Sequence, residues 1–171
     1  MGRFKKAIIF IFLIVSFMLT ACGQANNNAS NENSSTGNEG GGTETVEKEG
    51  LTFTAETEEK NDSLLIRLSL ENTSDESKVV EFSSGHQFDI VIRDEEGTKL
   101  YNFAEGKMFT QAIITEELSP GDSLTFEDEW NYSDLTFESL KIGTKLNIYQ
   151  IDGQPVDEQP YQLVIPYENN R

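Results

Sequence analysis

The sequence predicts an all-β protein whose folded unit, residues 51–171, is an antiparallel β-sandwich of seven to nine strands. Apolar and polar residues alternate in short runs, which is typical of strands that are buried on one face. Turn-forming residues recur roughly every ten to fifteen residues. We find no convincing amphipathic helix of three turns, so a helical fold does not compete with this prediction.

Alternating runs mark the expected strands, and tight turns separate them. The runs are Leu51–Ala55, Leu64–Glu71, Phe88–Arg93, Leu124–Trp130, Leu146–Gln150 and Leu163–Ile165. The turns are Asn72–Asp75, Asp94–Gly97, Ser119–Gly121 and Asp152–Gly153, all of them rich in residues that favour chain reversal. The short stretch Leu135–Leu140 suggests a single helical turn. Because the unit contains no cysteine, packing alone must hold the two sheets together.

Residues 1–21 have the pattern of an export signal. Met1–Lys6 carries three positive charges, and Ala7–Leu19 follows without any charge. As a helix, Ala7–Leu19 would span about 20 Å, less than the roughly 30 Å of the hydrocarbon core of a bilayer. We therefore predict a signal peptide and set aside the alternative, a transmembrane anchor.

The signal ends in Leu19-Thr20-Ala21-Cys22, and Cys22 is the only cysteine of the chain. These four residues resemble the lipobox of bacterial lipoproteins. The resemblance implies cleavage before Cys22 and attachment of lipid, such as palmitate, to its thiol. Two or more acyl chains hold a protein stably at a membrane, so Cys22 is the predicted lipidation site and the lipid bilayer a predicted partner. The predicted location is the extracytoplasmic face of a bacterial cell membrane; a free cysteine placed here by chance is the alternative.

Residues 22–50 are predicted to be the lipidated cysteine followed by a disordered tether. The segment after Cys22 consists mainly of Gly, Asn, Ser, Thr and Glu, and Val46 is its only large apolar residue. Such a segment buries too little apolar surface to offset the entropy lost on ordering it. As a flexible coil it would span about 30 Å and hold the folded unit clear of the lipid.

The net charge and the single cysteine and histidine exclude several classes of function. Lys and Arg number 13 against 30 Asp and Glu, and the resulting net charge of −17 repels phosphate, so no nucleic acid partner is expected. One cysteine and one histidine, His86, exclude cysteine-based and multi-histidine metal sites. A Ser-His-Asp triad would need His86, which we expect to be a turn residue, so the chain is predicted not to be an enzyme. No cofactor or metal is expected. Oxygen ligands are available at Asp94–Glu96 and at Asp152 with Asp157–Glu158, but the D-x-D-x-D-G spacing of a dedicated calcium loop is absent, so we expect weak calcium binding at most.

The least regular part of the unit is Phe103–Gln111, which breaks the alternation. It contains Gly106, then Lys107 in an otherwise acidic protein, then the bulky apolar pair Met108 and Phe109. An exposed loop of this kind is a candidate partner-contact loop, formed by these last four residues. The simpler interpretation, which we favour, is that the bulky apolar side chains of the segment enter the core while the chain crosses between the sheets.

A series of short motifs runs through the folded unit in a fixed order. They are Leu68-x-Leu70-x-Asn72-Thr73-Ser74, Ser84-Gly85-x-x-Phe88-Asp89, Asp94-x-x-Gly97, Phe103, Met108–Ala112, Leu118-x-Pro120-Gly121, Phe126 and Trp130. Their order and spacing resemble the BsuPI family of proteinase inhibitors over roughly Leu51–Tyr167, although this chain has Phe103-Ala104 where the family commonly has a Trp-Ser pair. The resemblance implies an immunoglobulin-like β-sandwich. It also implies inhibition of an intracellular subtilisin-like serine proteinase, without assigning inhibitory residues.

Two functions follow as hypotheses. The preferred one is a membrane-tethered extracytoplasmic lipoprotein whose sandwich is a protein-binding module, here an inhibitor of subtilisin-like serine proteases. An exported chain would not meet an intracellular enzyme, so its partner would be an extracellular protease, or the scaffold would be reused. The alternative is a structural or accessory envelope lipoprotein without inhibitory activity, which binds another envelope protein. Exposure of Met108 and Phe109 distinguishes the two hypotheses, since an apolar side chain offered to a protease cleft must be exposed.

Overall fold

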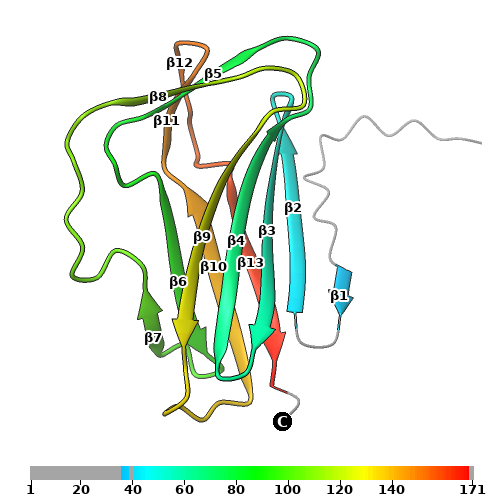
Figure 1. Cartoon of the computed structure of the whole chain (residues 1–171), viewed down its shortest axis with the longest axis vertical. Coiled ribbons are helices and arrows are strands. Elements are labelled where there is room, and N and C mark those ends of the chain that lie inside the picture. Colours follow the sequence, from blue (N-terminus) through cyan, green and yellow to red (C-terminus); the bar gives the residue numbers. More distant parts are fainter. Residues whose placement is uncertain (1–35, 39–40, 170–171) are drawn as a thin grey trace, which may run out of the picture.

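The structure, a computed structural model, describes residues 36–38 and 41–169, which form three antiparallel sheets and contain no helix (Figure 1). The first sheet has the strand order β1-β2-β3-β4-β9, the second β13-β10-β6-β7 and the third β12-β11-β5-β8. The strands are β1 Thr36–Asn38, β2 Gly41–Lys48, β3 Leu51–Lys60, β4 Ser63–Asn72, β5 Lys78–Phe82, β6 Phe88–Asp94, β7 Lys99–Asn102, β8 Ile114–Leu118, β9 Ser123–Asn131, β10 Ser139–Leu146, β11 Ile148–Ile151, β12 Gln154–Pro155 and β13 Gln162–Glu168.

The first and second sheets form the two layers of a sandwich, and the third sheet caps one end of it (Figure 1). In the first sheet, cross-strand pairing places Leu68 between Ala55 and Phe126. In the second sheet, Ile142 lies between Ile92 and Ile165. Alternation sends such side chains into one shared core, whose fully buried members include Phe53, Leu64, Ile66, Leu68, Leu70, Phe82, Ile90, Ile92, Ile142 and Ile165. The predicted all-β antiparallel sandwich is therefore confirmed.

The second layer is interrupted where the chain passes from the second sheet to the third. Strands β10 and β11 are separated by a single residue, Asn147. Its backbone N–H donates to Gln87 O (2.8 Å), and its side-chain amide donates to His86 O (3.0 Å). These bonds join the break to the connection between β5 and β6, so the two sheets keep a fixed relation at this point.

Each predicted run lies within a strand except Leu146–Gln150, which crosses the break at Asn147 between β10 and β11. Each predicted turn separates strands. The structure has more strands than the seven to nine predicted, in part because β7, β11 and β12 are short pieces of two to four residues. The expected helical turn at Leu135–Leu140 is wrong. Leu135 N–H instead donates to Tyr132 O (2.9 Å) in a turn, and β10 begins at Ser139.

The prediction of a disordered tether up to residue 50 is wrong for its last part, because Gly41–Lys48 forms β2 and pairs with β3 in six successive positions from Thr43 to Lys48. Gly41 and Gly42 allow β2 to pack closely against its neighbours and do not serve as flexible linker residues. A Cβ on Gly42 would lie 2.7 Å from Ile165 Cγ2, and one on Gly41 would lie 2.2 Å from Thr57 O. The signal peptide, Cys22 and most of the tether lie outside the described residues. Within the part of the chain that the structure describes, no helix is long and apolar enough to cross a membrane.

The turn at Asp152 contributes a pH-dependent contact to the third sheet. Asp152 Oδ1 accepts a hydrogen bond from Val79 N–H (2.9 Å), and its Oδ2 lies 3.2 Å from Lys78 Nζ. The Val79 hydrogen bond and, less strongly, the Lys78 ammonium lower the pKa of this carboxyl. A depressed pKa in the folded state stabilises the fold above the unfolded pKa, and this stabilisation is lost as pH falls through the folded value.

We therefore expect Asp152→Asn to lower stability slightly at neutral pH, by about 1 kcal/mol or less because the pair is partly exposed. Asparagine suits the positive φ of 52° at this position, so the backbone should not change. The difference in melting temperature from wild type should shrink as pH falls below about 4. A difference that stays constant from pH 7 to pH 3 would show that the carboxylate charge contributes nothing.

Candidate functional site

The candidate site is the connection between β7 of the second sheet and β8 of the third, residues 103–113, which we call the contact loop. Figure 1 shows it as the long connection along the left edge of the view. It begins in hydrogen-bonded turns: Glu105 N–H donates to Asn102 O (3.1 Å) and Lys107 N–H to Ala104 O (3.2 Å). The contact loop thus has ordered backbone structure although it contains no strand.

Phe103 and Lys107 anchor the N-terminal side of the contact loop. Phe103 N–H donates to Ile90 O (2.9 Å), and its ring packs 4.1 Å from the ring of Phe88, centroid to centroid. Lys107 Nζ lies 3.3 Å from the centre of the Phe103 ring and 3.8 Å from Asp128 Oδ1. A cation over an aromatic face and beside a carboxylate is attracted by both. Lys107 is therefore held against the sandwich.

Tyr101 holds the other oxygen of the Asp128 carboxylate. Its hydroxyl donates to Asp128 Oδ2. Burial, together with the neighbouring carboxylate, raises the pKa of Tyr101, so the hydroxyl remains a donor at physiological pH. The Asp128 carboxylate is thereby oriented toward Lys107.

Phe109 anchors the C-terminal side of the contact loop. Its ring stacks on the imidazole of His86 with a centroid distance of 4.3 Å and an interplanar angle of 13°. The next residue, Thr110, accepts a hydrogen bond at its carbonyl from Gly85 N–H (2.9 Å). Phe109 is half-buried as a result.

Met108 lies between these two anchored sides, and its side chain is 99% exposed. The preceding Gly106 has a φ of 75°, and a Cβ there would meet no atom within 4 Å. The simpler interpretation of the segment is therefore wrong for Met108, whose exposure is the condition that a partner-contact loop requires. Phe103 packs against the core, as the simpler interpretation has it. Phe109 does not enter the core but stacks on His86, and Met108 projects into solvent.

His86 does not form the hydrogen bonds of a nucleophilic triad. Its Nε2 lies 3.7 Å from Asp89 Oδ2, but Ser84 Oγ accepts a hydrogen bond from the backbone N–H of His86 (3.2 Å) and not from its ring. The oxygens considered for calcium also hold turns, since Asp94 Oδ1 accepts from Thr98 N–H (2.7 Å). Within residues 36–38 and 41–169, no three His, Cys, Asp or Glu side chains are grouped so as to hold a metal ion.

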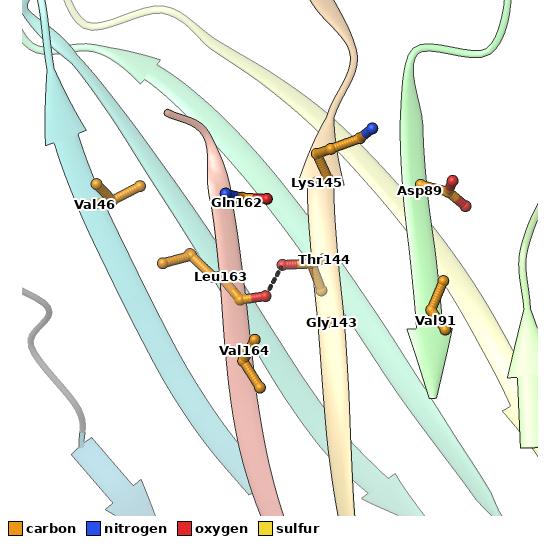
Figure 2. A pocket seen from close by; sticks show the side chains of 9 residues that line it. All are labelled: Val46, Asp89, Val91, Gly143, Thr144, Lys145, Gln162, Leu163 and Val164. Atoms are coloured by element: carbon orange, nitrogen blue, oxygen red, sulfur yellow. Dashed lines mark hydrogen bonds between the residues drawn. The ribbon is translucent and has the colours of Figure 1, made fainter. Parts of the chain in front are cut away.

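A separate depression of about 690 Å³ crosses β6, β10 and β13 and reaches Val46 of β2 (Figure 2). It exists because Gly143, which has no side chain, lies between Val91 and Val164 on the neighbouring strands. Its charged lining residues, Asp89 and Lys145, are cross-strand neighbours. The depression contains no residue of the contact loop.

Sequence reasoning identified residues 106–109 but not the residues that hold them. Gly85, His86, Tyr101 and Asp128 lie in or beside other strands, and no spacing in the sequence connects them to Met108. Only the pairing of strands brings them to the contact loop. Cys22, the predicted lipidation site, lies outside the described residues.

Comparison with known proteins gives one family match. The sequence model of the BsuPI family, described as intracellular proteinase inhibitor, matches residues 51–150, which include the contact loop. No curated protein matches the chain significantly. Among solved structures, the chain is similar to a DUF1425 family member from Shewanella sp. pv-4, with 10% identity, a TM-score of 0.30, and coverage of 80% of this chain and 99% of that one.

Proposed function

This chain belongs to the BsuPI family of intracellular proteinase inhibitors, and we propose that it inhibits a subtilisin-like serine proteinase by presenting Met108 to the cleft of the enzyme. The observation that carries the proposal is the position of Met108. Its side chain is 99% exposed, while Lys107 and Phe109 on either side are held against the sandwich.

The physical basis is preorganisation. A loop that is already ordered loses little conformational entropy on binding, so more of the contact energy appears as affinity. An exposed methionine adds the hydrophobic gain of entering an apolar subsite, about 1.5–3 kcal/mol for a side chain of this size. Its flexible thioether also adapts to subsites of different shape.

Titration against a panel of subtilisin-like serine proteases tests the proposal. The chain from Gly23 to Arg171 keeps every described strand and lacks the leader and Cys22. We expect the peptidase activity of at least one enzyme to fall to zero near equimolar inhibitor. If no enzyme in the panel is inhibited while the chain remains intact, the alternative function, an accessory envelope lipoprotein, is favoured instead.

We also propose that the chain is exported and anchored through lipid on Cys22, on the extracytoplasmic face of a bacterial membrane. The basic and apolar leader and the Leu19–Cys22 motif support this. The proposal has a consequence for the target. A chain placed there would meet a secreted or surface proteinase, in contrast to the intracellular enzymes after which the family is described.

Replacing Cys22 by alanine tests the anchor. In cells fed a clickable palmitate analogue, the wild-type chain should incorporate the label and Cys22→Ala should not, because the chain has no other thiol. Most of the wild-type protein should sediment with membranes and carry a cleaved, acylated N-terminus at Cys22. An unlabelled wild-type chain whose leader is intact would contradict the lipoprotein assignment.

A further inference from the structure

We infer that Gly85 and His86 act as a clamp on the contact loop, and that this clamp makes the chain an inhibitor rather than a substrate of its target proteinase. The inference rests on the proposed function. It assigns a positioning role to two residues that lie outside the contact loop and need not touch the enzyme.

Gly85 brings two backbone segments into direct contact. Its N–H donates to Thr110 O (2.9 Å). A Cβ at this position would lie 2.7 Å from Thr110 Oγ1 and 3.3 Å from Thr110 N, closer than side-chain carbons ordinarily approach. A side chain at position 85 would therefore have to displace Thr110, so glycine favours the close attachment of the contact loop here.

His86 holds the residue next to Met108. Its imidazole stacks almost parallel on the Phe109 ring, at 4.3 Å and 13°. The histidine is itself fixed to the sandwich, because its carbonyl accepts from the Asn147 side chain (3.0 Å) and its N–H donates to Ser84 Oγ (3.2 Å). Asn147 is the residue between β10 and β11, so the stack is anchored where two sheets meet.

Met108 is consequently bounded by two independent attachments. On one side Lys107 is held by Phe103 and Asp128, and on the other Phe109 is held by His86. If the bond between Met108 and Phe109 is cut, both new ends remain attached to the same scaffold.

This arrangement matters for a serine proteinase because acylation is reversible. The serine oxygen bonds to the Met108 carbonyl carbon, the bond to the Phe109 nitrogen breaks, and the serine proton passes to that nitrogen. If Phe109 stays on His86, its amine remains beside the acyl group at a high effective concentration. It then re-forms the peptide bond and expels the serine before water hydrolyses the ester. If Phe109 is released, water enters and the chain is cleaved.

The test compares His86→Ala with His86→Phe in the chain from Gly23 to Arg171, against a proteinase that the wild type inhibits. His86→Ala should raise the inhibition constant roughly tenfold to hundredfold and speed cleavage between Met108 and Phe109 at least about tenfold, as followed by mass spectrometry. His86→Phe, which keeps a flat ring against Phe109, should restore values near those of wild type.

Melting temperatures separate positioning from a structural role, because a merely structural residue would change stability without changing the cleavage rate of the folded chain. The clamp is refuted if His86→Ala inhibits as well as wild type and is cut no faster. If the wild type inhibits no enzyme, the proposed function fails, but the clamp can still be tested by limited subtilisin digestion. Faster nicking within residues 103–113 of His86→Ala than of His86→Phe would support the clamp, and equal nicking would refute it.

Discussion

Replacing Asn72 by aspartate is expected to destabilise the folded chain by roughly 3–5 kcal/mol at neutral pH, although the two side chains have nearly the same shape. Asn72 is fully buried. Its Nδ2 donates to Glu76 O and to Leu118 O, both at 2.8 Å, and its Oδ1 accepts from Ser74 N–H (3.1 Å) and Ser74 Oγ (2.7 Å). Aspartate would place a carboxylate oxygen against two carbonyl oxygens at a fully buried position.

The position of Asn72 in the chain explains why this cost is large. Asn72 ends β4 of the first sheet, and Leu118 ends β8 of the third. The backbone of Asn72 also donates to Asp122 O (3.0 Å) and accepts from Gly121 N–H (2.8 Å). One side chain therefore joins the sandwich to its capping sheet, and losing its two donated bonds removes a hydrogen-bond partner from the carbonyls of Glu76 and Leu118.

Asn131→Asp is the matched control. Asn131 makes the same local turn, since its Oδ1 accepts from Ser133 N–H (3.1 Å), but it is exposed. The change should alter the free energy of unfolding by less than about 0.5 kcal/mol. Urea unfolding followed by the fluorescence of Trp130, the one tryptophan of the chain, measures both variants. Equal effects at the two positions would contradict the role assigned to Asn72.

Replacing Met108 by aspartate is expected to weaken inhibition by about 100-fold or more while leaving the fold unchanged. In the free chain this side chain contacts almost nothing, so stability should not change. In the complex an ionised carboxylate would enter an apolar subsite without a partner, which costs at least about 2.7 kcal/mol, or two orders of magnitude in affinity.

Leu135→Asp controls for the loss of one exposed apolar side chain and the gain of one negative charge. Leu135 is 44% exposed and lies in the connection between β9 and β10, outside the contact loop. This variant should inhibit as the wild type does. If both variants lose inhibition equally, net charge rather than the contact loop determines binding. If neither loses it, the contact surface lies elsewhere.

The sequence analysis predicted those strands of the sandwich in which large apolar residues occupy every second position. In β4, leucine or isoleucine occupies each inward position from Leu64 to Leu70, so the period of two was plain. The sequence analysis missed β2 because the inward positions of this strand include Gly42 and Glu44, residue types that are common in linkers. Glycine is needed in β2 because the strand lies very close to Ile165. The amino-acid composition of the segment does not indicate such a contact.

The candidate site was predictable only in part. The break in alternation correctly marked the loop around Met108. The exposure of each residue was not predictable, because it depends on partners supplied by distant strands. His86 precedes Phe109 by 23 positions and reaches it only through the fold, and Asp128 reaches Lys107 from β9. Since such contacts follow from strand order, they required the structure.

The most direct test of the central claim, that the contact loop is the inhibitory surface, is the oxidation rate of Met108 in the free and the proteinase-bound chain. From Gly23 onward, Met108 is the only methionine, so conversion to the sulfoxide by hydrogen peroxide reports on this side chain alone. Mass spectrometry of the peptide containing Met108 gives the rate. We expect bound proteinase to slow oxidation at least about tenfold, because a 99% exposed side chain becomes buried in the cleft. An unchanged rate in a fully inhibited complex would place the contact surface elsewhere on the molecule.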